Sequence, residues 1–378
     1  MIETDIYSKL VEDALANREQ YLSEARQSVV RWDYYDNEFY RVAPMYFEQN
    51  LRARGQRIDE STASTSPWSY AYGFDQNGHL RYVRRGNEEE GIERDGSKLI
   101  NRRYNDRGVY AIEELVYEQG MPSRFLEFKE PECYFKEEYI HRESRLVHAS
   151  RFEQWPHRQG TRAYEYDFAY NADGRLQSIK QDGKVMYQAL TIDEAAALRQ
   201  EVFEGLVQET ERTILRFGDV VTEDELCFVG IWIHGEAFGI LNPIFYGGVQ
   251  RIREQQLADG DELGLIWSAA EHPDYTEALE NPALEERFSL LLQYWKYHSG
   301  VPAKREVELE RGDMWWECLA LWHGVAMELN MRDWTDRIPA TDTFVIFIDE
   351  EALMVVNGDL EHSVPSKKIR MLKEKGLL

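Results

Sequence analysis

The sequence has few cysteines, no long hydrophobic run and no recognisable export signal. Its three cysteines, Cys133, Cys227 and Cys318, have spacings that fit neither a disulfide framework nor a metal site. The longest apolar stretch, residues 226–233, is far too short to span a bilayer. The first residues are acidic and lack the basic and apolar segments of a signal peptide. We therefore expect a cytoplasmic protein that does not enter the membrane.

The sequence also lacks the short motifs that carry well-known chemistries. It contains no Gly-x-Ser-x-Gly elbow, no phosphate-binding loop, no dinucleotide fingerprint and no His-Glu-x-x-His zinc pattern. Cys318 and His323 are five residues apart on one predicted helix, so they point to different faces and should not form a catalytic pair. We expect no catalytic residue, no cofactor and no metal.

Positive charge is scarce relative to negative charge. The 378 residues carry a formal net charge of −25. Residues 1–190 have 27 Lys and Arg against 33 Asp and Glu, whereas residues 191–378 have 17 against 36. Such a field repels the phosphates of nucleic acids and steers basic proteins toward the acidic surface. We expect a protein partner of basic character and no nucleic acid, although solubility alone also explains an acidic surface.

A short phrase recurs in the first half of the chain. An aromatic residue stands four positions before a glycine, and a large residue stands two positions after it, in residues 74–80, 104–110 and 170–176. Asn-Gly and Asp-Gly are strong signals for tight hairpin turns, and alternating large residues around them indicate strands with one apolar face. Residues 139–146 form a degenerate copy, in which Ser144 stands where the glycine would be. Residues 66–190 therefore predict an antiparallel meander of hairpins.

The phrase resembles the tyrosine-aspartate repeats, also called YD or RHS repeats, of bacterial polymorphic toxins. The resemblance rests on Phe74-Asp75 and Tyr166-Asp167 together with Asn77-Gly78 and the run Asp173-Gly174-Arg175-Leu176. The glycines are spaced 30 and 66 residues apart, which differs from the regular arrays of toxin-enclosing shells. Shorter versions of the pattern are similar to those of small acidic proteins encoded beside such toxins. The resemblance implies an immunity-type protein that binds a toxin.

The hydrophobic pattern predicts a helix over residues 5–28 and, after residue 190, an α+β domain. Thr191 and Glu194 have the spacing of a capping box at the start of a helix that ends near residue 210. Further helices are predicted at 282–299, 312–330 and 366–375, strands at 226–233 and 263–267, and a central strand at 343–348. Residues 61–67 read as a polar loop. We expect an α+β protein with two domains, residues 1–190 and 191–378.

Three hypotheses for function remain open from the sequence. The first is a non-enzymatic protein-interaction module, with the toxin inhibitor as its specific form. Its candidate partner-binding residues are acidic: Asp259, Asp261, Glu262, Glu271 and Asp274. The second is a carbohydrate-active hydrolase with paired carboxylates and tryptophan platforms, although helical spacing places Trp315, Trp316 and Trp322 in a core instead. The third is a structural scaffold protein.

Overall fold

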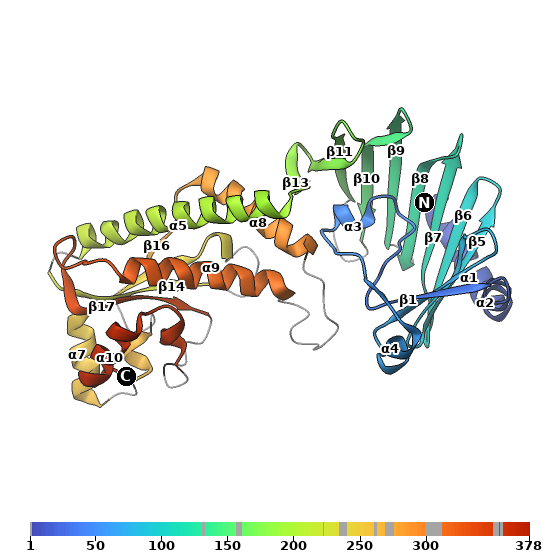
Figure 1. Ribbon diagram of the computed structural model, residues 1–378. Coiled ribbons are helices and arrows are strands. Elements are labelled where there is room, and N and C mark those ends of the chain that lie inside the picture. The colour runs from blue at the N-terminus through green and yellow to red at the C-terminus, as the bar shows by residue number, and fades with distance from the viewer. Residues whose placement is uncertain are drawn as a thin grey trace. The chain divides into compact units, whose positions relative to one another are not determined.

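The computed structural model forms two compact units, each of which combines helices with a β-sheet. The first unit comprises Met1–Ala189 and Lys296–Gly312, and the second comprises Leu190–Trp295 and Asp313–Leu378. The protein is therefore of mixed α+β class (Figure 1). The structure describes residues 2–130, 133–155, 161–221, 223–233, 240–260, 263–268, 276–298, 312–350, 355 and 358–378. Among these residues, no helix combines the length and apolar character needed to cross a membrane.

The sheet of the first unit has thirteen strands, and from β3 to β13 each strand pairs with the next one along the chain. All of these pairings are antiparallel, so this part of the sheet is a continuous meander of hairpins (Figure 1). At the far end, β1 pairs with β3 and with β2. The strands are β1 Arg31–Tyr35, β2 Arg57–Ile58, β3 Tyr70–Phe74, β4 Leu80–Arg85, β5 Glu88–Asp95, β6 Lys98–Asn105, β7 Gly108–Glu118, β8 Met121–Glu130, β9 Cys133–Arg142, β10 Arg145–Gln154, β11 Thr161–Tyr170, β12 Leu176–Gln181 and β13 Lys184–Gln188.

The repeated phrase forms the turns of these hairpins. Gly78 and Gly174 have φ angles of 77° and 79°, in the left-handed region that glycine adopts without strain. In the degenerate copy, Glu143 and Ser144 take φ angles of 50° and 63° instead. Two consecutive residues with positive φ define the hairpin turn that matches the twist of the strands. The degenerate copy therefore also closes a hairpin, through a tighter two-residue turn of a different type.

Helices α1 (Ile2–Ala16) and α2 (Arg18–Gln27) cover one face of this sheet, over β4 to β7. Ala14, Leu22 and Ala25 pack there against Tyr82, Tyr104 and Ile112. We call this face of the sheet the helix face.

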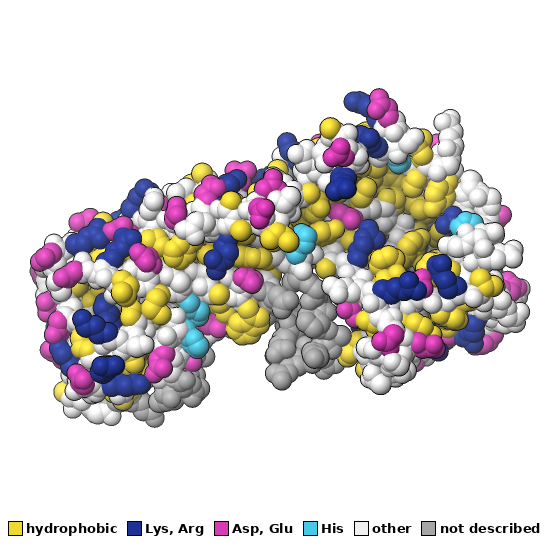
Figure 2. Space-filling model, viewed as in Figure 1, with side chains coloured by type: hydrophobic (Ala, Val, Ile, Leu, Met, Phe, Trp, Pro, Cys, Tyr) yellow, Lys and Arg dark blue, Asp and Glu magenta, His cyan; other side chains and the backbone are white. Residues whose placement is uncertain are grey.

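The segment after β1 lies on the opposite face of the sheet. Val42, Ala43 and Met45 pack there against side chains of many strands, from Tyr72 in β3 to Tyr187 in β13. The short helix α3 (Tyr46–Gln49) contacts β13, although β1 lies near the other end of the strand order. The sheet therefore curls around this segment (Figure 1), and hydrophobic side chains gather in its hollow (Figure 2).

A buried charged cluster lies inside the curl and consists of Glu38, Arg41, Glu90, Arg103 and Glu113. Arg41 lies 2.5 Å from Glu38 and 3.5 Å from Glu113. Arg103 lies 3.2 Å from Glu90 and 3.7 Å from Glu113. Three carboxylates thus share two guanidinium groups. Burial raises the pKa of Glu113 to about 7 against the opposing effect of Arg103 and Arg41, so the most deeply buried carboxylate takes up the proton most readily.

The second unit is a three-layer arrangement around a four-stranded sheet, in the order β16-β15-β14-β17. β14 and β17 are parallel, and the other pairs are antiparallel. Helices α5, α8 and α9 pack on one face of the sheet, and α7 and α10 lie on the other (Figure 1). The elements are α5 Ile192–Val220, β14 Leu226–Trp232, β15 Ile244–Val249, α7 Gln250–Asp259, η1 Leu265–Trp267, β16 Thr276–Glu277, α8 Pro282–His298, α9 Gly312–Asn330, β17 Ala340–Asp349, η4 Asp359–His362 and α10 Ser366–Glu374.

Several local predictions are confirmed and others are wrong. The capping box is present, because Thr191 accepts from the Glu194 amide at 3.2 Å and Glu194 accepts from the Thr191 amide at 2.8 Å. Its helix continues to Val220, beyond the predicted end. Residues 265–267 form a 3₁₀ turn rather than a strand, and the strand containing 343–348 lies at the edge of its sheet rather than at its centre.

The predicted polar loop at residues 61–67 is also wrong, because the short helix α4 (Glu60–Thr65) forms there. The side chain of Asp59 accepts from the backbone amide of Thr62 at 2.8 Å and so caps the start of this helix. Asp59 lies outside residues 61–67, so the polar composition of that run alone did not indicate the cap.

Candidate functional site

A furrow follows β3 on the helix face of the first unit, because the outward side chains of this strand are small. Ala71 and Gly73 face outward, while Tyr70, Tyr72 and Phe74 between them face the hollow of the sheet. Each small residue is flanked by large ones from the neighbouring strands. We call this feature the β3 furrow; its walls are formed by Arg26, Trp32, Tyr34, Glu60, Ser64, Tyr82, Arg84 and Glu89.

The register of the strands builds the furrow as two successive rows. In the first row, Gly73 pairs with Trp32 on one side and with Tyr82 on the other. The two rings meet edge to face, with centroids 5.7 Å apart. A Cβ at Gly73 would lie 2.6 Å from a methyl group of Val29, so a side chain there would force the packing apart. The side chain of Val29 therefore packs directly over Gly73, which has no side chain of its own to displace it.

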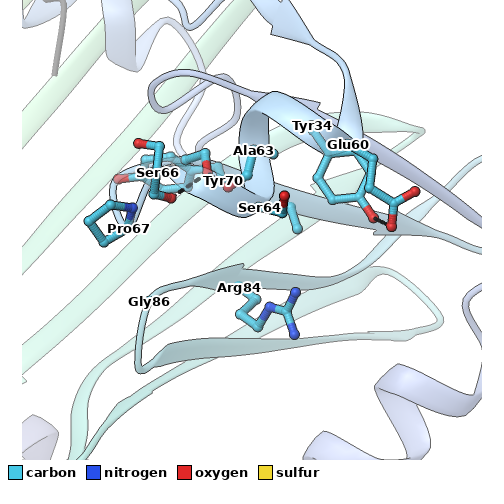
Figure 3. A pocket seen from close by; sticks show the side chains of 11 residues that line it. Tyr34, Glu60, Ala63, Ser64, Ser66, Pro67, Tyr70, Arg84 and Gly86 are labelled. Atoms are coloured by element: carbon cyan, nitrogen blue, oxygen red, sulfur yellow. Dashed lines mark hydrogen bonds between the residues drawn. The ribbon is translucent and has the colours of Figure 1, made fainter.

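In the second row, Ala71 pairs with Tyr34 and with Arg84. The hydroxyl of Tyr34 donates to Glu60, the first residue of α4, at 2.9 Å. Figure 3 shows this pair beside Ser64 of α4, with Arg84 reaching in from β4 across the cavity. The cavity between them has a volume of about 260 Å³, and the adjoining cavity over Trp32 and Tyr82 has about 410 Å³.

The two arginines of the furrow differ in the contacts that their side chains make. Arg26 lies 2.6 Å from Glu89 and stacks over the ring of Tyr82, 5.2 Å from its centroid. Tyr82 donates to the same carboxylate, and burial raises the pKa of its hydroxyl to about 12. The side chain of Arg84, in contrast, is exposed, and its guanidinium makes no hydrogen bond or ion pair to any described residue. Its guanidinium is therefore available to a ligand or partner.

The furrow is lined by groups that stack, pair with charges and form hydrogen bonds. Its described lining residues include no histidine and no cysteine, so it has neither of the side chains that most often act as a base or thiol nucleophile. The lining instead offers aromatic faces, two guanidinium groups, serine hydroxyls and the carboxylates of Glu60 and Glu89. These groups make contacts by stacking and by directed hydrogen bonds.

A Ser-His-Asp arrangement on the same face of the sheet differs from a hydrolase triad in its hydrogen bonds. Ser150 lies 3.5 Å from His148, and His148 lies 2.9 Å from Asp167. However, Glu165 is 2.9 Å from the second ring nitrogen of His148, and Ser150 donates its hydroxyl to Glu165. The hydrogen bond to Asp167 raises the pKa of His148, which favours the imidazolium. Because the Ser150 hydroxyl donates to Glu165, it does not donate to His148 as the serine of such a triad does.

The structure describes one of the five predicted partner-binding residues. Asp259 is exposed at the end of α7. Asp261, Glu262, Glu271 and Asp274 lie outside the described residues. The acidic partner-binding site therefore stays a prediction.

We did not predict the β3 furrow from the sequence. Ser69, Ala71 and Gly73 alternate there with aromatic residues, and this alternation could have indicated it.

The tryptophans of α9 divide between core and surface. Trp315 and Trp322 are buried, as their helical spacing predicted, whereas Trp316 is 52% exposed and the core prediction for it is wrong.

Cys318 is buried, and burial raises the pKa of its thiol. Nδ1 of His323 lies 2.8 Å from the hydroxyl of Ser363. Among the described residues, no group of three or more His, Cys, Asp or Glu side chains could hold a metal ion.

No protein-family model matches this chain, and a search of curated proteins finds no match.

Proposed function

We propose that this chain is a non-enzymatic, cytoplasmic protein-interaction module, and that the β3 furrow is the centre of its binding surface. The observation that carries the proposal is the composition of the furrow. Trp32, Tyr34 and Tyr82 line it together with Arg26 and Arg84. Tryptophan, tyrosine and arginine are the residues that dominate binding energy at protein interfaces, where they cluster near the centre.

The scaffold under the furrow favours the same function. Its aromatic residues come from β1 and β4, two strands joined through β3 by continuous pairing, so their positions are fixed before binding. A rigid arrangement of aromatic side chains loses little conformational entropy when a partner docks. Arg84 supplies a guanidinium that makes no bond to a described residue and can form a bidentate pair with a carboxylate of the partner.

The specific form that we propose is an immunity-type inhibitor of a bacterial toxin. The resemblance of the hairpin phrase to toxin-associated repeats supports it, and so does the net charge of −25. A basic partner would be drawn in by the long-range field and then fixed by the furrow. On the face shown in Figure 2, acidic and basic side chains of the second unit are interspersed. We therefore assign the acidic excess to steering and the furrow to specific contact.

Affinity capture with matched variants tests this proposal. The tagged protein is used to capture partners from a native lysate, quantified by mass spectrometry, alongside R84A and the control R142A. Arg142 is an exposed arginine of β9 outside the furrow. We expect one basic protein, captured equally by wild type and R142A and reduced about tenfold by R84A, which corresponds to a loss of ~1.4 kcal/mol.

The salt dependence of capture tests the electrostatic steering, and the R84A variant tests the furrow. Because steering depends on exposed charges, capture should fall as the ionic strength rises. A partner that R84A captures as well as wild type would refute the furrow as the site. A partner whose capture is indifferent to salt would refute electrostatic steering.

A further inference from the structure

A second cavity lies in the second unit, at the carboxyl end of β17. It has a volume of about 370 Å³, within the range of small-molecule sites. The parallel pairing of β14 and β17 places their carboxyl ends at one edge of the sheet, where ligand sites of parallel sheets are found. We call it the His323 cavity; it is lined by Trp316, Leu319, Ala320, His323, Ile348, Glu350, Asp359 and His362.

The hydrogen bonds around Ser363 fix the tautomer of His323. Ser363 is fully buried, and its hydroxyl oxygen accepts from the backbone amide of Ile348 at 3.1 Å. The hydroxyl proton needs an acceptor, and Nδ1 of His323 lies 2.8 Å away. Nδ1 therefore accepts, and the ring carries its proton on Nε2.

The same arrangement keeps His323 neutral. Protonation would turn Nδ1 into a donor and leave the buried hydroxyl of Ser363 without an acceptor. Burial acts in the same direction and, with the neighbouring His362, lowers the pKa of His323 to about 4. At neutral pH the cavity thus has a fixed, uncharged donor at Nε2.

The other polar groups of the cavity are two carboxylates and the imidazole of His362, and one wall is aromatic. Glu350 and Asp359 contribute carboxylates, which accept hydrogen bonds and donate none when ionised. Glu350 is held by the indole of Trp315, which donates to it at 2.7 Å. Trp316 lines the cavity while 52% exposed. The cavity therefore combines an aromatic surface, an N–H donor at His323, a second imidazole at His362 and two strong acceptors.

We propose that the His323 cavity binds a neutral saccharide. The C–H face of a sugar ring packs against an aromatic ring, its hydroxyls donate to carboxylates, and a hydroxyl oxygen accepts from an imidazole N–H. In this account the face of Trp316 supports the ring, Glu350 and Asp359 accept from hydroxyls, and Nε2 of His323 donates to an oxygen. Two carboxylates disfavour an anionic sugar by charge repulsion.

Binding is tested on the full chain with glucose, galactose, mannose and N-acetylglucosamine. Glucuronate and choline serve as an anionic sugar and a cation without a sugar ring. Titration calorimetry gives the affinities, and long-range ¹H–¹⁵N spectra report the tautomer and environment of His323. We expect at least one neutral sugar to bind and to shift the Nε2 resonance of His323, while glucuronate binds more weakly.

Two exposed tryptophans provide a matched pair of variants. W316A removes the proposed platform, and W68A removes a tryptophan of the first unit that is 38% exposed. We expect W316A to weaken sugar binding about tenfold and W68A to leave it unchanged. The proposal is overturned if no neutral sugar binds, if W316A binds as wild type does, or if choline binds more tightly than every sugar.

Discussion

The side chain of Asn330 forms both backbone hydrogen bonds that a neighbouring strand would have offered to Ile346. Its amide donates to the Ile346 carbonyl at 2.6 Å, and its oxygen accepts from the Ile346 amide at 3.1 Å. Ile346 lies in β17, the edge strand of its sheet. Lys368 donates to the Phe344 carbonyl at 2.8 Å in the same way. These side chains occupy an edge that could otherwise recruit a strand from another chain.

We therefore expect N330D to destabilise the second unit by about 2 kcal/mol or more, since a carboxylate cannot donate to the buried carbonyl of Ile346. The variant should also increase concentration-dependent association through the opened edge. Urea unfolding measures the first effect, and analytical ultracentrifugation measures the second. A variant as stable and monodisperse as wild type would show that the edge is protected by other means.

Two aromatic rings of the second sheet lie over glycines of the paired strands. Phe228 pairs with Gly248, and a Cβ at Gly248 would lie 2.1 Å from its ring. Tyr246 covers Gly230 in the same manner. We predict that G248A costs about 1–3 kcal/mol of unfolding free energy, because the buried ring has to move. G264A serves as the control, because a Cβ at Gly264 would meet open space and its φ of −62° suits alanine.

The pKa of Glu113 predicts how stability depends on pH. Its folded pKa of about 7 lies above the ordinary value of 4.5, so the folded state retains a proton that the unfolded state has lost. Stability contributed by this group is therefore present below pH 4.5, falls as the pH rises to 7, and changes little above that.

E113Q carries a neutral amide at every pH and isolates this effect. The stability of wild type relative to E113Q should fall between pH 5 and pH 7.5, by about 1–3 kcal/mol, as measured by urea unfolding at each pH. A constant difference across this range would show that Glu113 is ionised throughout.

The capping box of α5 makes a local prediction. T191A removes the acceptor for the Glu194 amide and should cost about 1 kcal/mol, whereas T191S keeps the hydroxyl and should cost little. Thermal unfolding compares the two variants. Equal losses in both would mean that the threonine methyl, rather than the hydroxyl, stabilises the helix start.

The sequence was most informative where structure is determined locally. Asn-Gly and Asp-Gly turns predicted the meander, and Thr191 with Glu194 predicted the start of α5, because the interactions involve residues a few positions apart. Residues 263–267 show the limit of this reasoning. Their apolar run fits a strand, but Trp267 instead packs against Phe228 and donates its indole N–H to Leu377, partners distant in the sequence.

The β3 furrow also depends on contacts between residues that are distant in the sequence. Ala71 and Gly73 form a furrow only because Trp32 and Arg84 come to lie on either side of β3, and strand order is not visible in a single sequence. The sequence likewise did not indicate that the sheet curls around residues 36–56. The alternation of small and aromatic residues in β3 was nevertheless present in the sequence, and it marks one face of that strand as recessed.

Photo-crosslinking from the furrow tests the central claim most directly. A benzoylphenylalanine is placed at position 34, within the β3 furrow, or at position 140, where Ile140 is 58% exposed outside the furrow. Both proteins are irradiated in the native cell. The account predicts a crosslink to one basic protein from position 34 and none to that protein from position 140. A partner that crosslinks from position 140 and not from position 34 would contradict it.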